Sequence, residues 1–457
     1  MAVLLGGFSV AVVVTTVFVG ILTYFTFRLL NGHLQQWYQL KPIPEIGPSM
    51  PFIGHTLMMK RGAGVDPLSP ISTGSKWRQR RKMLTPTFHF SILTEFLEVM
   101  NEQAAILVNK LGREVGKGCF NCFNHITLCA LDIICETAMG KKLSAQSNSD
   151  SEYVQCVYKM SDIITRRQRM PWFWSDLSYN VFGEGLEHNR RLKTLHSFTS
   201  TVIHERVEHM RLSEEQEADG VSEQRTRKRQ AFLDMLLKTV DEGGNKLTHQ
   251  DIQEEVDTFM FEGHDTTAAA MNWAVHLLGS HPEVQRKVQL ELHKVLGESE
   301  RPITMEDLKE LRYLDCVIKE SLRLFPSVHF FARRLCDDAV INGFKVSKGT
   351  NAVVLVYALH RDPRYFPNPE EFQPERFFPE NCVGRPPYAY VPFSAGLRNC
   401  IGQRFAMMEE KVVLASILRS FNIEACQTRE ELHPLGEIVL RPENGILIKL
   451  ERRTSSQ

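Results

Sequence analysis

The chain carries no excess charge of either sign, because its 54 lysines and arginines are balanced by 54 aspartates and glutamates. Without a global positive field, nothing in the composition points to nucleic acid as a partner. Ten cysteines among 457 residues fall well short of a disulfide-rich composition, and their positions follow no framework spacing. We therefore expect free thiols and a reducing compartment.

A second C-x-x-C pair, which a zinc ribbon would need, is also missing. Cys119 and Cys122 form one such pair, and no second pair follows at the required distance. We interpret both as core or surface thiols in preference to a metal or redox site. With 43% hydrophobic residues, the chain can bury the core of one large domain or two modest ones.

Charged side chains are absent from residues 2–27, where Val, Leu, Ile and Phe dominate. A helix of this length can cross about 30 Å of hydrocarbon. The stretch lacks the basic start and the short apolar core of a cleaved signal peptide. Arg28 and Lys41 follow it, and positive charge on that side predicts a cytosolic body. We predict a single-pass transmembrane anchor over 2–27 in preference to a buried core helix.

Four prolines between Pro42 and Pro51 predict a stiff, extended hinge over residues 28–54. The main domain is expected over residues 55–457. Within it, the segment from Arg211 to Gln230 is almost free of apolar residues and is interpreted as a solvated loop.

Apolar periodicity predicts a mostly α-helical fold with small β portions. The clearest helix begins at Thr248, with a capping-box partner at Asp251, and runs to about Gly279. Other elements are predicted from periodicity and turn signals alone: a helix over Met305–Leu324, a hairpin of Ala339–Ile341 and Phe344–Val346, a strand over Asn351–Tyr357, and a last helix from Cys400 to about Phe421.

The segment from Phe393 to Gly402 carries the clearest chemical signal. Cys400 is expected to open a helix, where backbone N–H groups and the helix dipole stabilise a thiolate. Arg398 supplies a permanent cation suited to a carboxylate. Taken alone, Cys400 could equally be an inert buried thiol.

The ten-residue pattern F-x-x-G-x-R-x-C-x-G resembles the haem-binding signature of the cytochrome P-450 superfamily and matches it at every fixed position. Leu397 stands where that family often has proline. The resemblance implies the cytochrome P-450 fold, a haem cofactor and Cys400 as the iron ligand. A thiolate on haem iron favours O–O cleavage.

Three charged residues upstream of this motif agree with the resemblance. Glu320 and Arg323, on the helix before Pro326, are similar to the family's E-x-x-R motif. Positions i and i+3 share one face of a helix, so both side chains can meet a third partner. Arg376 resembles the arginine that completes a buried salt-bridged triad with them.

The long helix contains the residues expected to handle oxygen. Asp265 and Thr266 lie in an apolar stretch and resemble the family's acid–alcohol pair, which delivers protons to bound dioxygen. The alternative is that the Thr266 hydroxyl bonds to its own helix. Gly263 is expected to leave room for the oxygen ligand.

Glu262, immediately before this glycine, points to one branch of the superfamily. The sequence F-M-F-E-G-H-D-T-T resembles that of cytochrome P-450 family 4, in which this glutamate can form an ester with a haem methyl. The segment from Tyr388 to Phe393 looks closest to subfamily V. Those enzymes are fatty-acid ω-hydroxylases.

Further cofactor and substrate contacts follow from the resemblance. Trp77, Arg81, Arg333 and Arg398 are expected to hold the haem propionates. A stretch after the E-x-x-R helix is expected to line the substrate channel: Ser327, Val328, His329 and Phe330. His329 replaces a proline of close relatives, which changes the expected shape of the channel.

The resemblance fails between about Lys60 and Ile71. Only 26 positions separate Pro51 from Trp77, where the family fits strands, a short helix and a substrate-contacting loop. The segment 55–72 is therefore abnormally short, and an internal deletion is the leading explanation. Such a chain would lose strand partners and one wall of the haem pocket.

The sequence thus predicts a haem-thiolate monooxygenase in the endoplasmic reticulum membrane. It would use dioxygen and electrons from an NADPH–cytochrome reductase to ω-hydroxylate fatty acids. A basic patch around the motifs is expected to dock the reductase: Arg80, Lys82, Arg404 and Lys411. The alternative is that these four residues are scattered surface charges. The rival hypothesis is a truncated, non-catalytic family member with weak or no haem binding. A haem-thiolate isomerase is disfavoured because it has no use for an acid–alcohol pair.

Overall fold

The structure is a computed structural model that describes residues 16–21, 23–28, 31, 75–88, 90–148, 152–218, 231–238 and 247–453. The chain divides into two compact units, each considered by itself. The smaller unit comprises Met1–Ala63 and Ala332–Val354, and the larger comprises Gly64–Phe331 and Leu355–Gln457.

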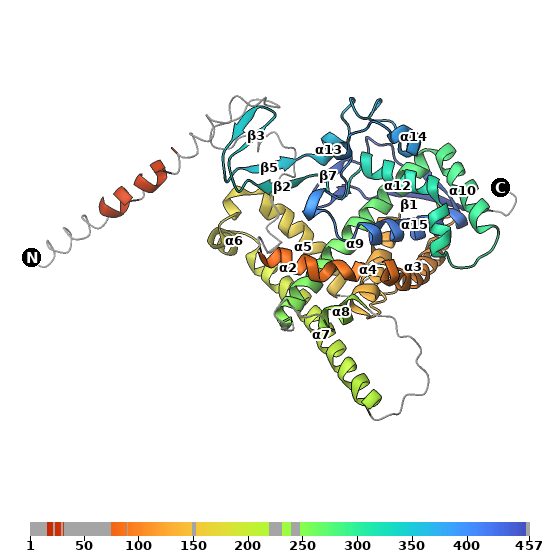
Figure 1. The fold of residues 1–457 in the computed structure, drawn as a ribbon, viewed down its shortest axis with the longest axis horizontal. Coiled ribbons are helices and arrows are strands. Elements are labelled where there is room, and N and C mark those ends of the chain that lie inside the picture. Colours follow the sequence, from red (N-terminus) through yellow and green to blue (C-terminus); the bar gives the residue numbers. More distant parts are fainter. Residues whose placement is uncertain are drawn as a thin grey trace, which may run out of the picture. The chain divides into compact units, whose positions relative to one another are not determined.

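The larger unit is mostly helical, as predicted (Figure 1). Its α-helices are α2 (Ser75–Leu84), α3 (Phe90–Leu111), α4 (Phe123–Ile134), α5 (Glu152–Arg169), α6 (Asp176–Phe182), α7 (Gly185–Ala218), α8 (Phe232–Lys238), α9 (His249–Ser280), α10 (Pro282–Leu296), α11 (Met305–Glu310), α12 (Arg312–Leu324), α13 (Val356–Leu359), α14 (Pro379–Cys382) and α15 (Gln403–Ser420). Shorter turns of helix are η1 (Thr85–Phe88), η2 (Cys135–Met139), η3 (Pro171–Phe173), η4 (Pro374–Phe377), η5 (Pro387–Ala389) and η6 (Gly396–Arg398).

Small sheets of two or three strands complete the structure. In the larger unit, β1 (Phe120–Asn121), β9 (Leu447–Arg452) and β6 (Phe421–Ala425) form one sheet in that order, and β7 (Pro434–Gly436) pairs with β8 (Leu440–Pro442). Two further two-stranded sheets are formed by β2 (Phe331–Arg334) with β5 (Asn351–Val354) and by β3 (Ala339–Ile341) with β4 (Phe344–Val346). The β3–β4 hairpin has the predicted bounds, because Asn342 and Gly343 both take the positive φ that its tight turn requires.

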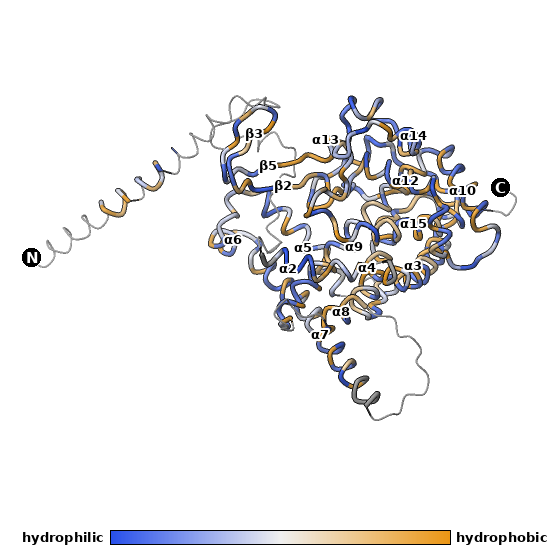
Figure 2. Tube along the Cα trace, viewed as in Figure 1, coloured by the Kyte–Doolittle hydropathy of each residue, from blue (hydrophilic) through white to orange (hydrophobic). Residues whose placement is uncertain are grey.

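Helix α9 organises the core of the larger unit. Its N-terminus has the predicted capping box, in which Thr248 accepts from the Asp251 N–H at 3.1 Å and Asp251 accepts from the Thr248 N–H at 3.2 Å. The helix packs against α4, α15, α12 and β6, and buries Trp273 completely. Figure 2 shows that α4 and α15 are largely hydrophobic. Burial of these faces fixes α9 within the unit.

Three predicted elements differ from the structure. The helix expected over Met305–Leu324 is two helices, because the Glu291 carboxylate accepts from the N–H groups of Tyr313 and Leu314 at 2.7 and 2.9 Å and so caps a new N-terminus. The strand expected over Asn351–Tyr357 ends at Val354 and is followed by α13. The loop expected from Arg211 begins instead as the last turns of α7, whose Glu, Gln and Ala residues are strong helix formers.

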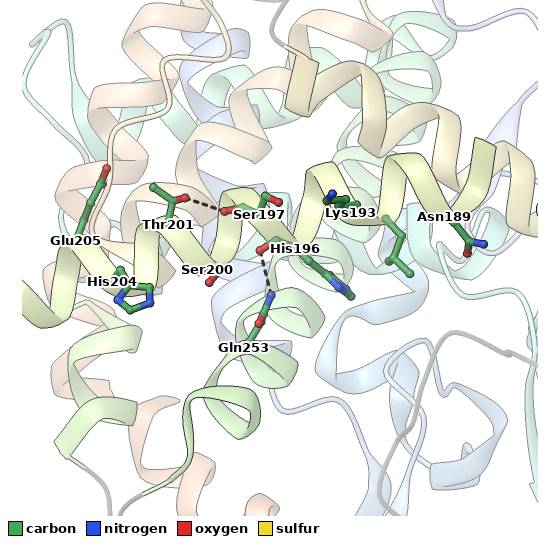
Figure 3. Close-up of a pocket in the computed structure, with 10 residues that line it drawn as sticks. Asn189, Lys193, His196, Ser197, Ser200, Thr201, His204, Glu205 and Gln253 are labelled. Atoms are coloured by element: carbon green, nitrogen blue, oxygen red, sulfur yellow. Dashed lines mark hydrogen bonds between the residues drawn. The ribbon is translucent and has the colours of Figure 1, made fainter. Parts of the chain in front are cut away.

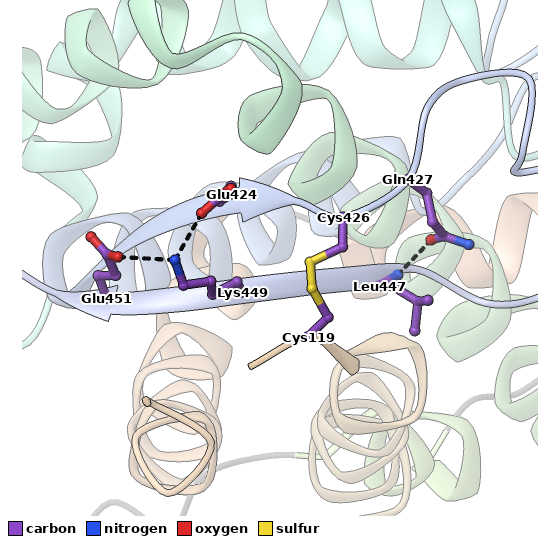
Figure 4. Close-up of a disulfide and its surroundings, with 7 residues drawn as sticks. All are labelled: Cys119, Glu424, Cys426, Gln427, Leu447, Lys449 and Glu451. Atoms are coloured by element: carbon purple, nitrogen blue, oxygen red, sulfur yellow. Dashed lines mark hydrogen bonds and ion pairs between the residues drawn. A yellow bond between two sulfur atoms is a disulfide. The ribbon is translucent and has the colours of Figure 1, made fainter. Parts of the chain in front are cut away.

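Cys119 and Cys426 form a disulfide, although 307 positions separate them in the sequence (Figure 4). Strand pairing brings them together, because Phe120 pairs with Ile448 while the Cys426 N–H donates to the Leu447 carbonyl at 2.9 Å. The prediction that all cysteines are free thiols is therefore wrong for this pair. A composition argument could not find it, since the two partners share no local spacing.

No helix among the described residues is long and apolar enough to span a bilayer. Residues 16–21 and 23–28 are helical. The rest of the predicted anchor, most of the predicted hinge and all of the short segment 55–72 lie outside the described residues.

Candidate active site

Cys400 lies in a tight loop between η6 and α15. Its N–H donates to the Phe393 carbonyl at 2.9 Å, which closes the loop on itself. Gly396 has φ +76°, a conformation that a side chain would strain. Helix α15 begins at Gln403, so Cys400 stands just before a helix N-terminus, as predicted.

The environment of the Cys400 thiol has opposing effects on its charge. Surrounding atoms raise its pKa through desolvation, although the residue is exposed. The nearby Glu262 carboxylate raises this pKa as well, whereas the backbone N–H groups of Gly402 and Gln403 and the Arg81 guanidinium lower it. The predicted stabilisation by backbone N–H groups is present, and Arg81 adds a cationic effect that was not predicted, but desolvation of the thiol outweighs both.

Helix α2 brings two of the predicted propionate contacts to this loop. Arg81 donates to the carbonyl and the side-chain oxygen of Asn399, each at 2.8 Å. The Arg398 guanidinium lies 4.1 Å from the centroid of the Trp77 ring. Trp77, Arg81 and Arg398 thus gather beside Cys400. Asn399 was missed by the sequence reasoning, because it occupies a variable position of the motif.

Glu262 belongs to the segment of α9 that faces the Cys400 loop. Its side chain is exposed and close enough to affect the Cys400 thiol electrostatically. A Cβ placed on Gly263 would lie 2.8 Å from the side chain of Ile134 at the end of α4. The absence of a side chain at Gly263 thus permits the close packing of α9 on α4, and the expectation that Gly263 makes room for an oxygen ligand stays a prediction.

Asp265 and Thr266 do not bond to each other in this structure. The Thr266 hydroxyl donates to the Glu262 carbonyl at 2.8 Å, which is the alternative that the sequence left open. The Asp265 carboxylate is buried and ion-paired with Arg441 of β8. No motif marks Arg441, and its partner is 176 positions away, so sequence reasoning could not identify it.

The predicted channel segment runs directly beside α9. Ser327 is buried and donates to the Thr266 carbonyl at 2.7 Å. Val328 is exposed, and the rings of His329 and Phe330 meet edge to face with centroids 4.8 Å apart. The segment is therefore adjacent to the predicted oxygen-handling turn of α9.

Glu320, Arg323 and Arg376 form a buried ion-pair network. Arg323 donates to both Glu320 oxygens at 2.7 and 2.8 Å, and the Arg376 Nε lies 3.4 Å from Glu320. Arg323 also donates to the carbonyls of His360, Pro369 and Glu371. These bonds tie α12 to the irregular segment before the Cys400 loop.

Two further groups of residues were predicted to act at or near the site. Arg333 belongs to the smaller unit, where it donates to the Ala332 carbonyl at 2.9 Å, and its role as a propionate contact stays a prediction. The basic docking patch is wrong for Arg80 and Lys411. Arg80 is ion-paired with Glu254 and Glu255 of α9 at 2.8 Å, and Lys411 with Asp315 at 2.9 Å.

The side chains around Cys400 fit a haem by their chemistry. One accessible sulfur, two guanidinium groups and one indole converge from α2 and the Cys400 loop. A thiolate suits iron, and arginines suit two carboxylates. Two surface cavities are lined by residues other than those around Cys400. One, of about 780 Å³, lies along α7, where Gln253 donates to the His196 carbonyl (Figure 3). The other, of about 620 Å³, lies beside His276 and Arg429.

A family model described as "Cytochrome P450", written here P-450, matches residues 48–450. The chain is a cytochrome P-450. Cytochrome P-450 4V2 of Rattus norvegicus is 55% identical over 97% of this chain and 95% of the relative. The human protein of the same name is 54% identical over 93% of each chain, and cytochrome P-450 4c3 of Drosophila melanogaster is 50% identical over 84% of this chain and 73% of its own. These relatives place the chain in family 4, subfamily V.

A solved structure supports the fold. The crystal structure of the cytochrome P-450DA haem domain matches with a TM-score of 0.70 over 84% of this chain and 78% of that chain, at 24% identity. Membership of the family, which the family model and the rat relative show, makes the chain a haem-dependent monooxygenase that uses dioxygen and a redox-partner reductase. When bound, the haem supplies oxygen activation at iron.

The alignment with the rat relative spans 505 positions, which is more than the 457 residues of this chain. The relative therefore has residues that this cytochrome P-450 lacks. That they belong in the short segment 55–72 stays a prediction.

Proposed function

We propose that this cytochrome P-450 hydroxylates the terminal carbon of medium- to long-chain fatty acids. Electrons would come from an NADPH–cytochrome reductase, and the chain would be anchored in the endoplasmic reticulum membrane. Terminal C–H bonds are the strongest of an alkyl chain, so selectivity for that carbon requires steric control.

Glu262 is the observation that carries this proposal. A carboxylate next to the Cys400 thiol narrows the space in which a substrate can approach the reacting centre. A bulky group there favours a slim methyl end over a methylene further along the chain. Ser327, bonded to the same turn of α9, fixes the adjoining wall at a set distance.

Exposed apolar side chains support contact with a bilayer. Six large apolar residues around η3, α6 and the start of α7 are between 61% and 80% exposed: Trp172, Trp174, Leu177, Val181, Phe182 and Leu186. Such a patch marks a membrane or protein contact, and tryptophan is typical of the membrane interface. Arg28 and Lys41 favour a cytosolic body, whereas the Cys119–Cys426 disulfide counts against a reducing compartment.

The full chain, reconstituted with reductase, NADPH and phospholipid, should convert saturated fatty acids to terminal alcohols. We expect the terminal alcohol to exceed the neighbouring secondary alcohol by about tenfold, which corresponds to about 1.4 kcal/mol of selectivity. Mass spectrometry of the extracted products measures this ratio. Equal amounts of the two alcohols, or no oxygenated fatty acid from haem-loaded protein, would refute the proposal.

The shorter length of the chain favours one rival function. Because residues of the rat relative have no counterpart here, the chain could be a non-catalytic member with weak or no haem binding. The absorption spectrum of the reduced, carbon-monoxide-bound protein separates the two, since it reports thiolate-ligated haem directly. A full haem complement with that spectrum excludes the rival.

Replacing Glu262 by alanine should release haem that the wild-type chain retains. An ester between a Glu262 oxygen and a haem methyl would form as one methyl C–H bond breaks, with the proton released and dioxygen, reduced by the reductase, as the two-electron oxidant. The ester would remove a carboxylate charge beside Cys400 and hold the macrocycle in place. Acid-denatured protein, separated by reversed-phase chromatography, shows whether haem absorbance travels with the polypeptide. Glu254→Ala, eight positions earlier on α9, is the matched control and should retain haem. Haem lost completely from folded wild-type protein would limit Glu262 to a steric role.

A further inference from the structure

The β7–β8 hairpin is attached to α9 about two turns after the predicted oxygen-handling residues. The Trp273 indole donates to the Leu440 carbonyl at 2.9 Å, and the Leu440 N–H donates to the Ser327 carbonyl at 2.9 Å. The hairpin is thus bonded both to α9 and to the predicted channel segment. Any side chain on β8 that faces α9 has a defined position.

Arg441 is the β8 side chain that meets Asp265. Their ion pair is buried, with 15% of the Arg441 side chain and 4% of the Asp265 side chain exposed. The Asp265 Oδ1 atom is engaged, whereas the buried Oδ2 atom has no hydrogen-bond partner among the described residues. A buried acceptor left without a donor is unfavourable, so Oδ2 is the Asp265 oxygen that remains open to an incoming hydrogen-bond donor.

A second ion pair continues from Arg441 toward solvent. Glu437, at the turn of the hairpin, interacts with Arg441 and lies 3.7 Å from Arg169 at the end of α5. The side chains of Glu437 and Arg169 are 20% and 23% exposed. Burial raises the pKa of the Glu437 carboxyl, while both arginines oppose this effect. Other titratable groups that face the pair are Tyr158 and His264, with Asp162 beside Glu437.

We propose that Arg441 is a positioning residue for Asp265 in the monooxygenase reaction. By holding Oδ1, Arg441 leaves Oδ2 as the oxygen at which a proton is accepted and released. The ion pair of Glu437 with Arg169 lies on the other side of Arg441, toward solvent. The proton that Asp265 takes up is the proton that it passes on, so the carboxylate is regenerated and no other bond changes. The proposal extends the proton-delivery role predicted for Asp265.

Arg441→Gln should divert electrons from product to peroxide. In the reconstituted full chain we expect product formed per NADPH to fall by at least about tenfold, because misplacing a reacting group by about 1 Å costs up to about 10²-fold. Arg441→Lys retains the charge and should restore at least part of this yield. Arg429→Gln is the matched control, since Arg429 is paired with the exposed Glu370. Its product yield should equal that of the wild type.

A double variant separates positioning from folding. Asp265→Asn removes the buried carboxylate, so adding Arg441→Gln leaves no unpaired charge. The double variant should then couple electrons to product as the Asp265→Asn single variant does, because the two residues act as one unit. A further fall in the double variant, or a wild-type product yield in Arg441→Gln, would overturn the proposal.

The outcome is distinguishable from failure of the proposed substrate class. If fatty acids are not hydroxylated, NADPH-derived electrons still end in peroxide or water. Arg441→Gln should then raise the share of peroxide, which is measured without any product. An unchanged share in haem-loaded Arg441→Gln would reject the role of Arg441, whatever the substrate is.

Discussion

Cys400→Ala should abolish the carbon-monoxide spectrum of thiolate-ligated haem and all monooxygenase turnover. Cys400 is exposed, and its thiol lies next to Arg81, the N-terminus of α15 and Glu262. These groups therefore act electrostatically on this thiol. A thiolate pushes electron density onto haem iron and favours O–O cleavage, and the alanine side chain supplies no ligand at all. Cys400→His should keep some haem through its imidazole but should not activate oxygen.

A matched control is available for this experiment. Cys336 is also exposed and free, and it belongs to the smaller unit. Cys336→Ala should therefore have the wild-type spectrum and turnover. Retention of both properties by Cys400→Ala would mean that another cysteine ligates the iron.

Arg323→Ala should destabilise the protein by about 3–5 kcal/mol, because it leaves the Glu320 carboxylate buried without its main partner. Arg323 also donates to three backbone carbonyls that position the segment before the Cys400 loop. We expect a lower urea midpoint and a lower haem content. Arg323→Lys should recover little, since an ammonium cannot reproduce the planar fork that grips both Glu320 oxygens.

Lys319, on the same helix, offers the comparison. It pairs with Asp315 one turn away, and its side chain is 39% exposed. Lys319→Ala should lower the free energy of unfolding by less than about 1 kcal/mol, as is usual for a solvent-exposed pair. If Arg323→Ala and Lys319→Ala lowered the free energy of unfolding equally, burial of the Glu320–Arg323 pair would not account for its contribution to stability.

Short-range patterns predicted the local features of this protein well. The capping box at Thr248, the hairpin around Asn342 and the helix after Cys400 each depend on residues within a few positions, so their geometry follows from neighbours along the chain. The same holds for the Cys400 motif, whose fixed spacing carries the chemistry. Membership of the cytochrome P-450 family could therefore be inferred before any contact was known.

Contacts between distant segments could not be predicted in this way. Asp265 was singled out from the sequence, but its partner Arg441 is 176 positions away, and the Cys119–Cys426 disulfide joins residues 307 positions apart. Glu291 divides a predicted single helix by capping α12 from α10. Each of these depends on how helices and strands pack, and a periodic pattern defines which face of a helix is buried but not which residue it meets. The candidate residues of the site could thus be named from the sequence, whereas their interaction partners depend on how distant segments pack.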